Sequence, residues 1–303
     1  GGQWAVPALP PDLRRALLKS ALGVAKKRTS PFAAADSLAY VQGLATGDAP
    51  DDAVAAFSAA VEAGSALLPA PTPTVGGGSP PPLDALALAQ MAFVYARLTS
   101  QAYASGMLAV AAALTALGES GDATFNMLYA LLAKWAPPGL CNDSSEPSLR
   151  AQAAQLTRLL LVYADPRSEA MVSAAGVDLA AMLDATTASL FAAPELGLDA
   201  DVVLDLWLFM TLTGAPHALT FVLVAALVEG GDVRPGVDGL ASVLVRDRLP
   251  AVLVRADALL RSAPRALALA LRSVHTAHHG GGSDALGLAD GLDLATLPCA
   301  TVD

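Results

Sequence analysis

Apolar residues recur at helical spacing along most of this chain. The first such run is made of residues three or four positions apart: Leu13, Leu17, Ala21 and Val24. Pro11 and Asp12 stand at its start, where a helix accepts proline and where the helix dipole favours an acid. The pattern predicts a helix over Pro11–Val24.

The same spacing predicts further helices, separated by Pro, Gly or polar residues. They cover Pro50–Leu68, Leu83–Leu117 with a break near Ser100–Ser105, Asp122–Trp135, Leu149–Tyr163, Asp178–Phe191, Ala200–Thr213, Ala218–Glu229, Gly239–Val245, Pro250–Ser262 and Pro264–His275. Strand alternation persists nowhere, and no repeat of fixed period occurs. We therefore expect an all-α fold with one multi-helix domain over residues 9–279.

Two segments lack any pattern that could build a core. Residues 69–82 are dense in Pro, Gly, Ser and Thr, which predicts a flexible surface loop within the domain. Residues 280–303 are Gly-rich and acidic, which predicts a loosely packed tail.

The composition supports the helical prediction and excludes several functions. Hydrophobic residues make up 54% of the chain and aromatic residues only 5%, so the excess is Ala, Leu and Val. A formal charge of -10 argues against nucleic acid and against anionic lipid as bulk partners. Cys141 and Cys299 have no metal-binding or redox spacing, which fits a reducing, cytoplasmic location.

The most apolar stretch does not predict a membrane span. It runs from Val202 to Val228 and is interrupted by Asp205 and by the segment Gly214–His217. The remaining apolar pieces are shorter than the roughly 20 residues that a spanning helix needs. Buried helices of a domain without a transmembrane segment are the better interpretation.

Cofactor and metal sites are not expected. His275, His278 and His279 could share one helix face, but they adjoin a glycine run and have no nearby acid or cysteine, which favours an exposed helix end. Gly76-Gly77-Gly78 lacks the Lys-Ser/Thr that follows the glycines of a phosphate-binding loop.

Three landmarks occur in a fixed order in the C-terminal half of the chain. They are Tyr163-Ala164-Asp165-Pro166, Ser189-Leu190-Phe191 and Leu204-Asp205-Leu206-Trp207. At the N-terminus, Leu9-Pro10-Pro11-Asp12-Leu13-Arg14 precedes Leu22-Gly23, and the middle of the chain carries Tyr103-Ala104-Ser105-Gly106-Met107. In this order, from Leu9 to Val228, the chain resembles a TBC domain, the all-helical module of Rab GTPase-activating proteins.

The resemblance implies where that family's catalytic groups would stand. Such proteins supply an arginine, which stabilises charge on the transferring phosphoryl group, and a glutamine, which positions the attacking water. The best register for the arginine motif places Phe57 in its acid position and Ala60 in the arginine position. Ser105 stands in the glutamine position. The arginine and the glutamine are called the catalytic fingers of the family. The resemblance therefore implies a domain without these fingers, closest to the finger-less subgroup that captures Golgi and endosomal vesicles.

A second register remains open as an alternative. Arg28-Thr29 and Tyr40-Val41-Gln42-Gly43-Leu44 also resemble the two finger motifs, but only fourteen residues separate Arg28 from Gln42. In this alternative, Arg28 and Gln42 make the chain an active Rab GTPase activator. Otherwise, Arg28 belongs to a basic helix end and Gln42 to an exposed turn.

The expected function is that of a Rab-GAP-like, catalytically inactive or unconventional domain of membrane trafficking. Its partner would be a Rab-family GTPase or a trafficking protein, contacted through Tyr103, Ser105, Gly106 and Met107. It would be cytoplasmic and peripheral on Golgi, endosomal or other trafficking membranes. A third possibility is a helical scaffold with no GTPase partner.

Overall fold

The computed structural model describes residues 9–27, 30–68, 83–136, 147–230 and 237–276. All regular structure in these residues is helical, with fourteen α-helices and no strand, so the all-α prediction is confirmed. The helices group into two compact units: an N-terminal unit, Pro11–Trp135, and a C-terminal unit from Ala136 onward. The predicted loop at 69–82, the tail at 280–303 and the domain end at residue 279 lie outside the described residues.

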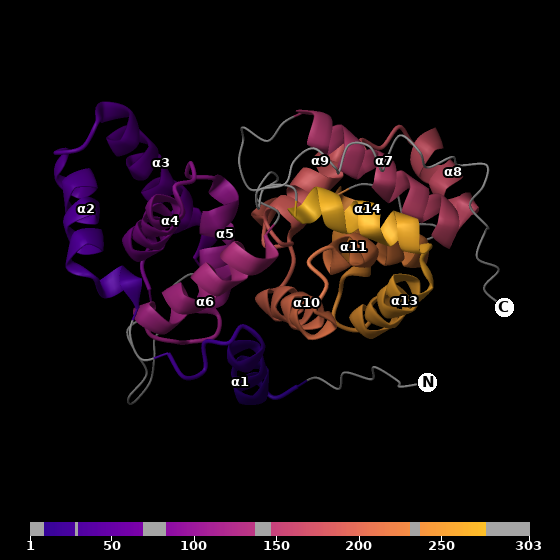
Figure 1. Cartoon of the computed structure of the whole chain (residues 1–303), viewed down its shortest axis with the longest axis horizontal. Coiled ribbons are helices and arrows are strands. Elements are labelled where there is room, and N and C mark those ends of the chain that lie inside the picture. Colours follow the sequence, from indigo (N-terminus) through magenta and orange to yellow (C-terminus); the bar gives the residue numbers. More distant parts are fainter. Residues whose placement is uncertain (1–8, 28–29, 69–82, 137–146, 231–236, 277–303) are drawn as a thin grey trace. The chain divides into compact units, whose positions relative to one another are not determined.

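The N-terminal unit contains six α-helices and one 3₁₀ turn (Figure 1). They are α1 (Pro11–Ala21), η1 (Pro31–Ala33), α2 (Ala35–Thr46), α3 (Asp51–Leu67), α4 (Ala85–Thr99), α5 (Ser105–Thr115) and α6 (Gly121–Trp135). The break predicted near Ser100–Ser105 is confirmed, because α4 ends there and α5 begins. Ser100 ends α4 in the left-handed region, with φ of 54°.

Helix α2 was not predicted from the sequence. Its buried face consists of Ser37, Val41 and Leu44, so one position of the apolar stripe is polar. Ala34 stands at its N-cap position and accepts no side-chain hydrogen bond there. Neither of the usual signals of a helix, a continuous apolar stripe and a capping residue, is therefore present.

The core of the N-terminal unit forms where α3 packs against α4 and α5. Phe57, Ala60 and Gly64 make one buried face of α3. A Cβ at Gly64 would lie 3.2 Å from the backbone oxygen of Ala85, so the close approach of α3 to α4 favours glycine at this position. Phe57 meets the ring of Phe93 edge-on, with centroids 5.2 Å apart.

The C-terminal unit contains eight α-helices and two irregular turns. They are α7 (Pro147–Ala164), α8 (Pro166–Ala174), α9 (Leu179–Leu183), the π-helical turn η2 (Asp184–Ala188), the 3₁₀ turn η3 (Pro194–Leu196), α10 (Ala200–Thr213), α11 (Ala218–Gly230), α12 (Val237–Val243), α13 (Leu249–Ser262) and α14 (Arg265–Thr276). Helix α8 was missed because it buries only Ser168 and Val172 and so presents no apolar stripe.

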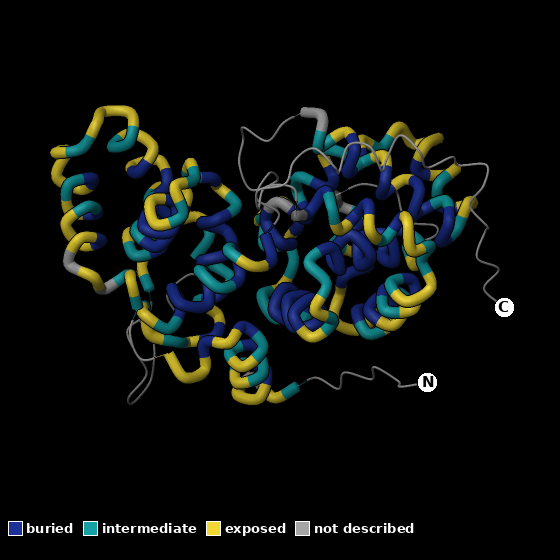
Figure 2. Tube along the Cα trace, in the orientation of Figure 1, coloured by how far each residue is buried: buried dark blue, intermediate teal, exposed yellow. Residues whose placement is uncertain are grey.

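Helix α11 is the core of the C-terminal unit. All ten residues from Ala218 to Leu227 are buried, and the helix appears almost entirely dark blue in Figure 2. It contacts α13 and α7 most extensively, and also α12 and α10. Each large apolar side chain buried here contributes about 1.5–3 kcal/mol, so α11 supplies much of the driving force for this unit. None of the described helices combines the length and the apolarity that a membrane crossing requires.

The Asp-Pro landmark is the N-terminus of α8. The Asp165 carboxylate accepts hydrogen bonds from the backbone N–H of Arg167 at 3.1 Å and of Ser168 at 3.2 Å, and from the Ser168 hydroxyl at 2.6 Å. Burial alone would raise the pKa of Asp165, but these hydrogen bonds and the nearby charge of Arg167 outweigh it, and the pKa is lowered from 3.8. The cap therefore stabilises the fold above pH 3.8 and loses this effect as the pH falls through the lowered pKa.

The Trp207 landmark holds an irregular turn in place. After η2, Leu190 and Phe191 adopt positive φ angles of 51° and 65°, which is unusual for residues other than glycine. Both side chains are buried, and the indole N–H of Trp207 donates to the Leu190 carbonyl at 2.7 Å. The helix predicted to reach Phe191 thus ends as an α-helix at Leu183 and continues as a π-turn.

We expect Trp207→Phe to lower the free energy of unfolding of the C-terminal unit by about 1–3 kcal/mol. The phenylalanine ring keeps most of the packing, but the Leu190 carbonyl loses its indole donor inside the protein. Urea denaturation followed by circular dichroism measures the effect.

Trp135→Phe is the matched control. Trp135 is also buried, but its indole nitrogen has no hydrogen-bond acceptor among the described residues. Its replacement should change stability much less, and equal losses for the two variants would contradict the role assigned to the Trp207 hydrogen bond.

Candidate functional site

The segment from Tyr103 to Met107 leads into α5 and contains the predicted partner-binding residues. The Tyr103 ring stacks on Phe93 with centroids 4.6 Å apart, and Met107 is fully buried. Ser105 is exposed, whereas Tyr103 and Gly106 are partly exposed. The stack and the buried methionine thus anchor this segment on both sides of Ser105, and they leave the serine accessible to a partner.

The position assigned to the arginine finger is not accessible. Ala60 is 2% exposed and Phe57 is 3% exposed, on the face of α3 that packs against α4 and α5. An alanine methyl fits this interface, but it presents no chemistry to a partner. Of the two finger positions in this register, only the one occupied by Ser105 lies at the surface.

The alternative register places Gln42 on α2. Gln42 is exposed, but the prediction that it lies in a turn is wrong. Arg28 lies outside the described residues, so its pairing with Gln42 stays a prediction. The sequence did not reveal that Arg97, at the end of α4, places its guanidinium over the ring of Tyr40, 4.3 Å from the centroid.

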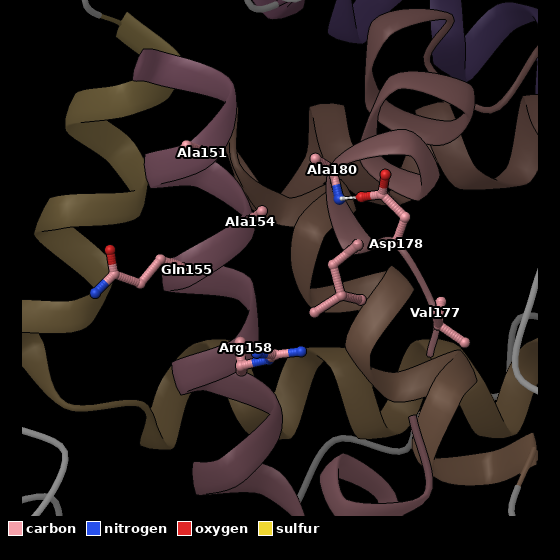
Figure 3. A pocket seen from close by; sticks show the side chains of 8 residues that line it. Ala151, Ala154, Gln155, Arg158, Val177, Asp178 and Ala180 are labelled. Carbon is pink, nitrogen blue, oxygen red and sulfur yellow. Dashed lines mark hydrogen bonds between the residues drawn. The ribbon is translucent and has the colours of Figure 1, made fainter. Parts of the chain in front are cut away.

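A groove of about 330 Å³ lies in the C-terminal unit (Figure 3). Its lining comes from one side of α7 and from the residues that lead into α9: Ala151, Ala154, Gln155, Arg158, Val177, Asp178, Leu179 and Ala180. The Asp178 carboxylate accepts from the backbone N–H groups of Ala180 at 2.9 Å and Ala181 at 3.1 Å, so it caps α9. The only positive charge in the lining is that of Arg158.

Ion pairs between α7 and its neighbours hold the surroundings of this groove. Arg158 lies 3.4 Å from Glu169 on α8, and Arg150 lies 3.5 Å from Asp184 of η2. The lining contains no nucleophilic side chain and no pair of free carboxylates. Its chemistry is therefore that of a polar contact surface with a floor of small residues. In the sequence, the spacing of Ala151, Ala154, Gln155 and Arg158 indicates that these four residues share one side of a helix, which is the side that lines the groove.

His275 corrects a prediction made from the sequence. It was expected at an exposed helix end, but it is 5% exposed and lies in the interior of the C-terminal unit near His217. His278 and His279 lie outside the described residues. Within the part of the chain that the structure describes, no group of three or more His, Cys, Asp or Glu side chains could hold a metal ion.

Comparison with known proteins adds no family to these observations. No protein-family model matches the chain, and a search of curated proteins finds no match.

We expect Ala60→Arg to destabilise the N-terminal unit strongly, by about 3 kcal/mol or more, because it places a charge inside a packed interface. Ala59→Arg is the matched control, since Ala59 is the exposed neighbour on the same helix and should change stability by less than about 0.5 kcal/mol. Thermal unfolding of both variants tests this. An Ala60→Arg protein as stable as the Ala59→Arg protein would show that the α3 interface opens readily enough to release an arginine.

Proposed function

We propose that this chain is a TBC-type helical module that binds a Rab-family GTPase or another trafficking protein and lacks both catalytic fingers. In this proposal the protein acts through binding, as a cytoplasmic, peripheral component at Golgi, endosomal or other trafficking membranes. It leaves GTP hydrolysis to the intrinsic activity of the GTPase.

The observation that carries the proposal is the state of the two finger positions. Ala60 is enclosed between helices, and Ser105 is exposed at the start of α5. GTPase activation needs a cation near the transferring phosphoryl group and a side chain that orients water. A buried methyl group and a short hydroxyl supply neither of these in this register.

The landmarks of the C-terminal unit support the same proposal. Asp165 caps α8, Leu190 and Phe191 form the buried turn, and Trp207 donates to that turn from α10. Each has a specific packing or hydrogen-bonding role, as expected for residues that define a fold. The resemblance therefore involves residues on which the helical scaffold depends.

The test is a binding and hydrolysis screen with a panel of Rab GTPases, each loaded with a GTP analogue, with GDP or with GTP. We expect nucleotide-dependent binding of at least one member and hydrolysis within about twofold of its intrinsic rate, because an arginine finger alone is worth roughly 10³–10⁵ in rate. Tenfold acceleration by the unmodified chain would favour the alternative with Arg28 and Gln42. Absence of any nucleotide-dependent binding would favour the scaffold without a GTPase partner.

We expect Ser105→Glu to weaken binding of that GTPase about tenfold, which corresponds to about 1.4 kcal/mol. The new charge would lie in the contact surface, and an acid in the first turn of α5 is compatible with the helix dipole. Isothermal titration calorimetry gives the affinity. Ser20→Glu on α1 introduces the same charge at another exposed position and should leave the affinity unchanged. Equal affinities for the two variants would remove Ser105 from the binding surface.

A further inference from the structure

Two buried imidazoles meet inside the C-terminal unit. His217 directly precedes α11 and is 7% exposed, and His275, near the end of α14, is 5% exposed. Their ring centroids are 6.3 Å apart. Phe221 covers His217 from the side, with centroids 5.7 Å apart. The pair thus joins two helices that are far apart in sequence.

The hydrogen bonds of His275 identify the tautomer of its neutral ring. Its Nδ1 lies 2.9 Å from the Leu271 carbonyl, which can only accept, so Nδ1 carries the hydrogen. In the neutral ring Nε2 then holds a lone pair, and the Thr220 hydroxyl donates to it at 3.5 Å. The Nδ1 of His217 is buried with no hydrogen-bond partner among the described residues.

The surroundings resist protonation of either ring. Burial lowers the pKa of His217 from 6.5 to about 4; the positive charge that His275 gains when it is protonated and the charge of Arg272 lower this pKa further. Burial also lowers the pKa of His275, against the opposing effect of its hydrogen bond to Leu271. Both charged groups that bear on His217, Arg272 and protonated His275, belong to α14.

Because both pKa values are lowered, acid destabilises the folded arrangement of the two histidines. A histidine whose pKa is lower in the folded protein binds fewer protons there than it does when released. For His217, the folded arrangement is therefore fully stable above about pH 6.5 and loses stability as the pH falls from 6.5 towards 4.

We propose that the His217–His275 pair is an acid-sensitive latch for α14. While both rings are neutral, α14 stays packed on α7 and joined to the start of α11 through the contact between His275 and Thr220. Protonation of the pair releases α14 and uncovers its buried face, which consists of Leu267, Ala270, Leu271 and Val274. The latch is independent of any GTPase partner.

Hydrogen exchange of the full-length chain tests the latch. Protection factors of the α14 amides are measured at about pH 7.5 and about pH 5, with intrinsic exchange rates corrected for pH. If released His217 regains its ordinary pKa of 6.5 instead of about 4, protection of α14 should fall roughly 30-fold between the two values. The carboxylate of Asp165, whose pKa is lowered, stays ionised at both.

The other helices of the same unit serve as internal standards. Protection of α10 and α13 should change less than about twofold over the same range, because neither contains a residue of the pair. An equal fall in these helices would mean general unfolding and would overturn the latch. Unchanged protection of α14 would also overturn it.

Two variants separate the histidines from other titrating groups. His217→Phe combined with His275→Gln removes both titrations, and the fall in α14 protection should shrink to within about twofold. Arg272→Gln, at an exposed position, keeps both rings but removes a charge that lowers the pKa of His217, so the fall should become smaller than in the unmodified chain. A full-sized fall in the double variant would contradict the proposal.

A measurement on the unmodified protein covers the case in which the double variant does not fold. In the latched state, the proton resonances of both rings should not titrate near pH 6.5. Titration of either ring at its ordinary pKa while α14 keeps its protection would rule the latch out.

Discussion

The structure of the C-terminal unit depends on the burial of α11. This helix is apolar on every side, and all its residues from Ala218 to Leu227 are buried. A helix of this kind is stable only when other helices cover its whole circumference. Helices α7, α10, α12 and α13 therefore pack against it; α7, α10 and α13 are labelled near it in Figure 1. Polar groups at the start of α11 are drawn into the interior. His217 and Thr220 are buried for this reason, and the contact of Thr220 with His275 becomes a condition for packing α14.

The irregular turn before α10 also follows from the burial of apolar side chains. Leu190 and Phe191 bury their side chains only by adopting backbone angles that disfavour residues with a Cβ. The π-turn η2 and the hydrogen bond from Trp207 stabilise this conformation. The indole of Trp207 thus connects α10 to the turn that follows η2. Its ring fills the core, and its N–H supplies the hydrogen bond to the Leu190 carbonyl.

The sequence predicted the helices whose ends carry chemical signals. Helix α10 has the predicted bounds because a polar, acidic start and Gly214, with a φ of 69°, delimit it. Helices α2 and α8 were missed because each buries few apolar residues and so leaves no clear periodicity, although Asp165 and Pro166 mark the start of α8. Spacing also indicates which residues share a face, but not what covers that face. This is why the burial of Ala60 and His275 was not predicted.

The residues that support the TBC resemblance differ in kind from those that would recognise a partner. Asp165, Phe191 and Trp207 cap a helix, fill the core or donate a buried hydrogen bond. Their replacement would lower the stability of the C-terminal unit, whatever partner the chain has. Recognition of a partner would depend on exposed groups, and the exposed residues at predicted finger positions are Ser105 and, in the alternative register, Gln42. Substitutions at such exposed positions preserve the scaffold, so a loss of binding there can be attributed to the contact surface itself.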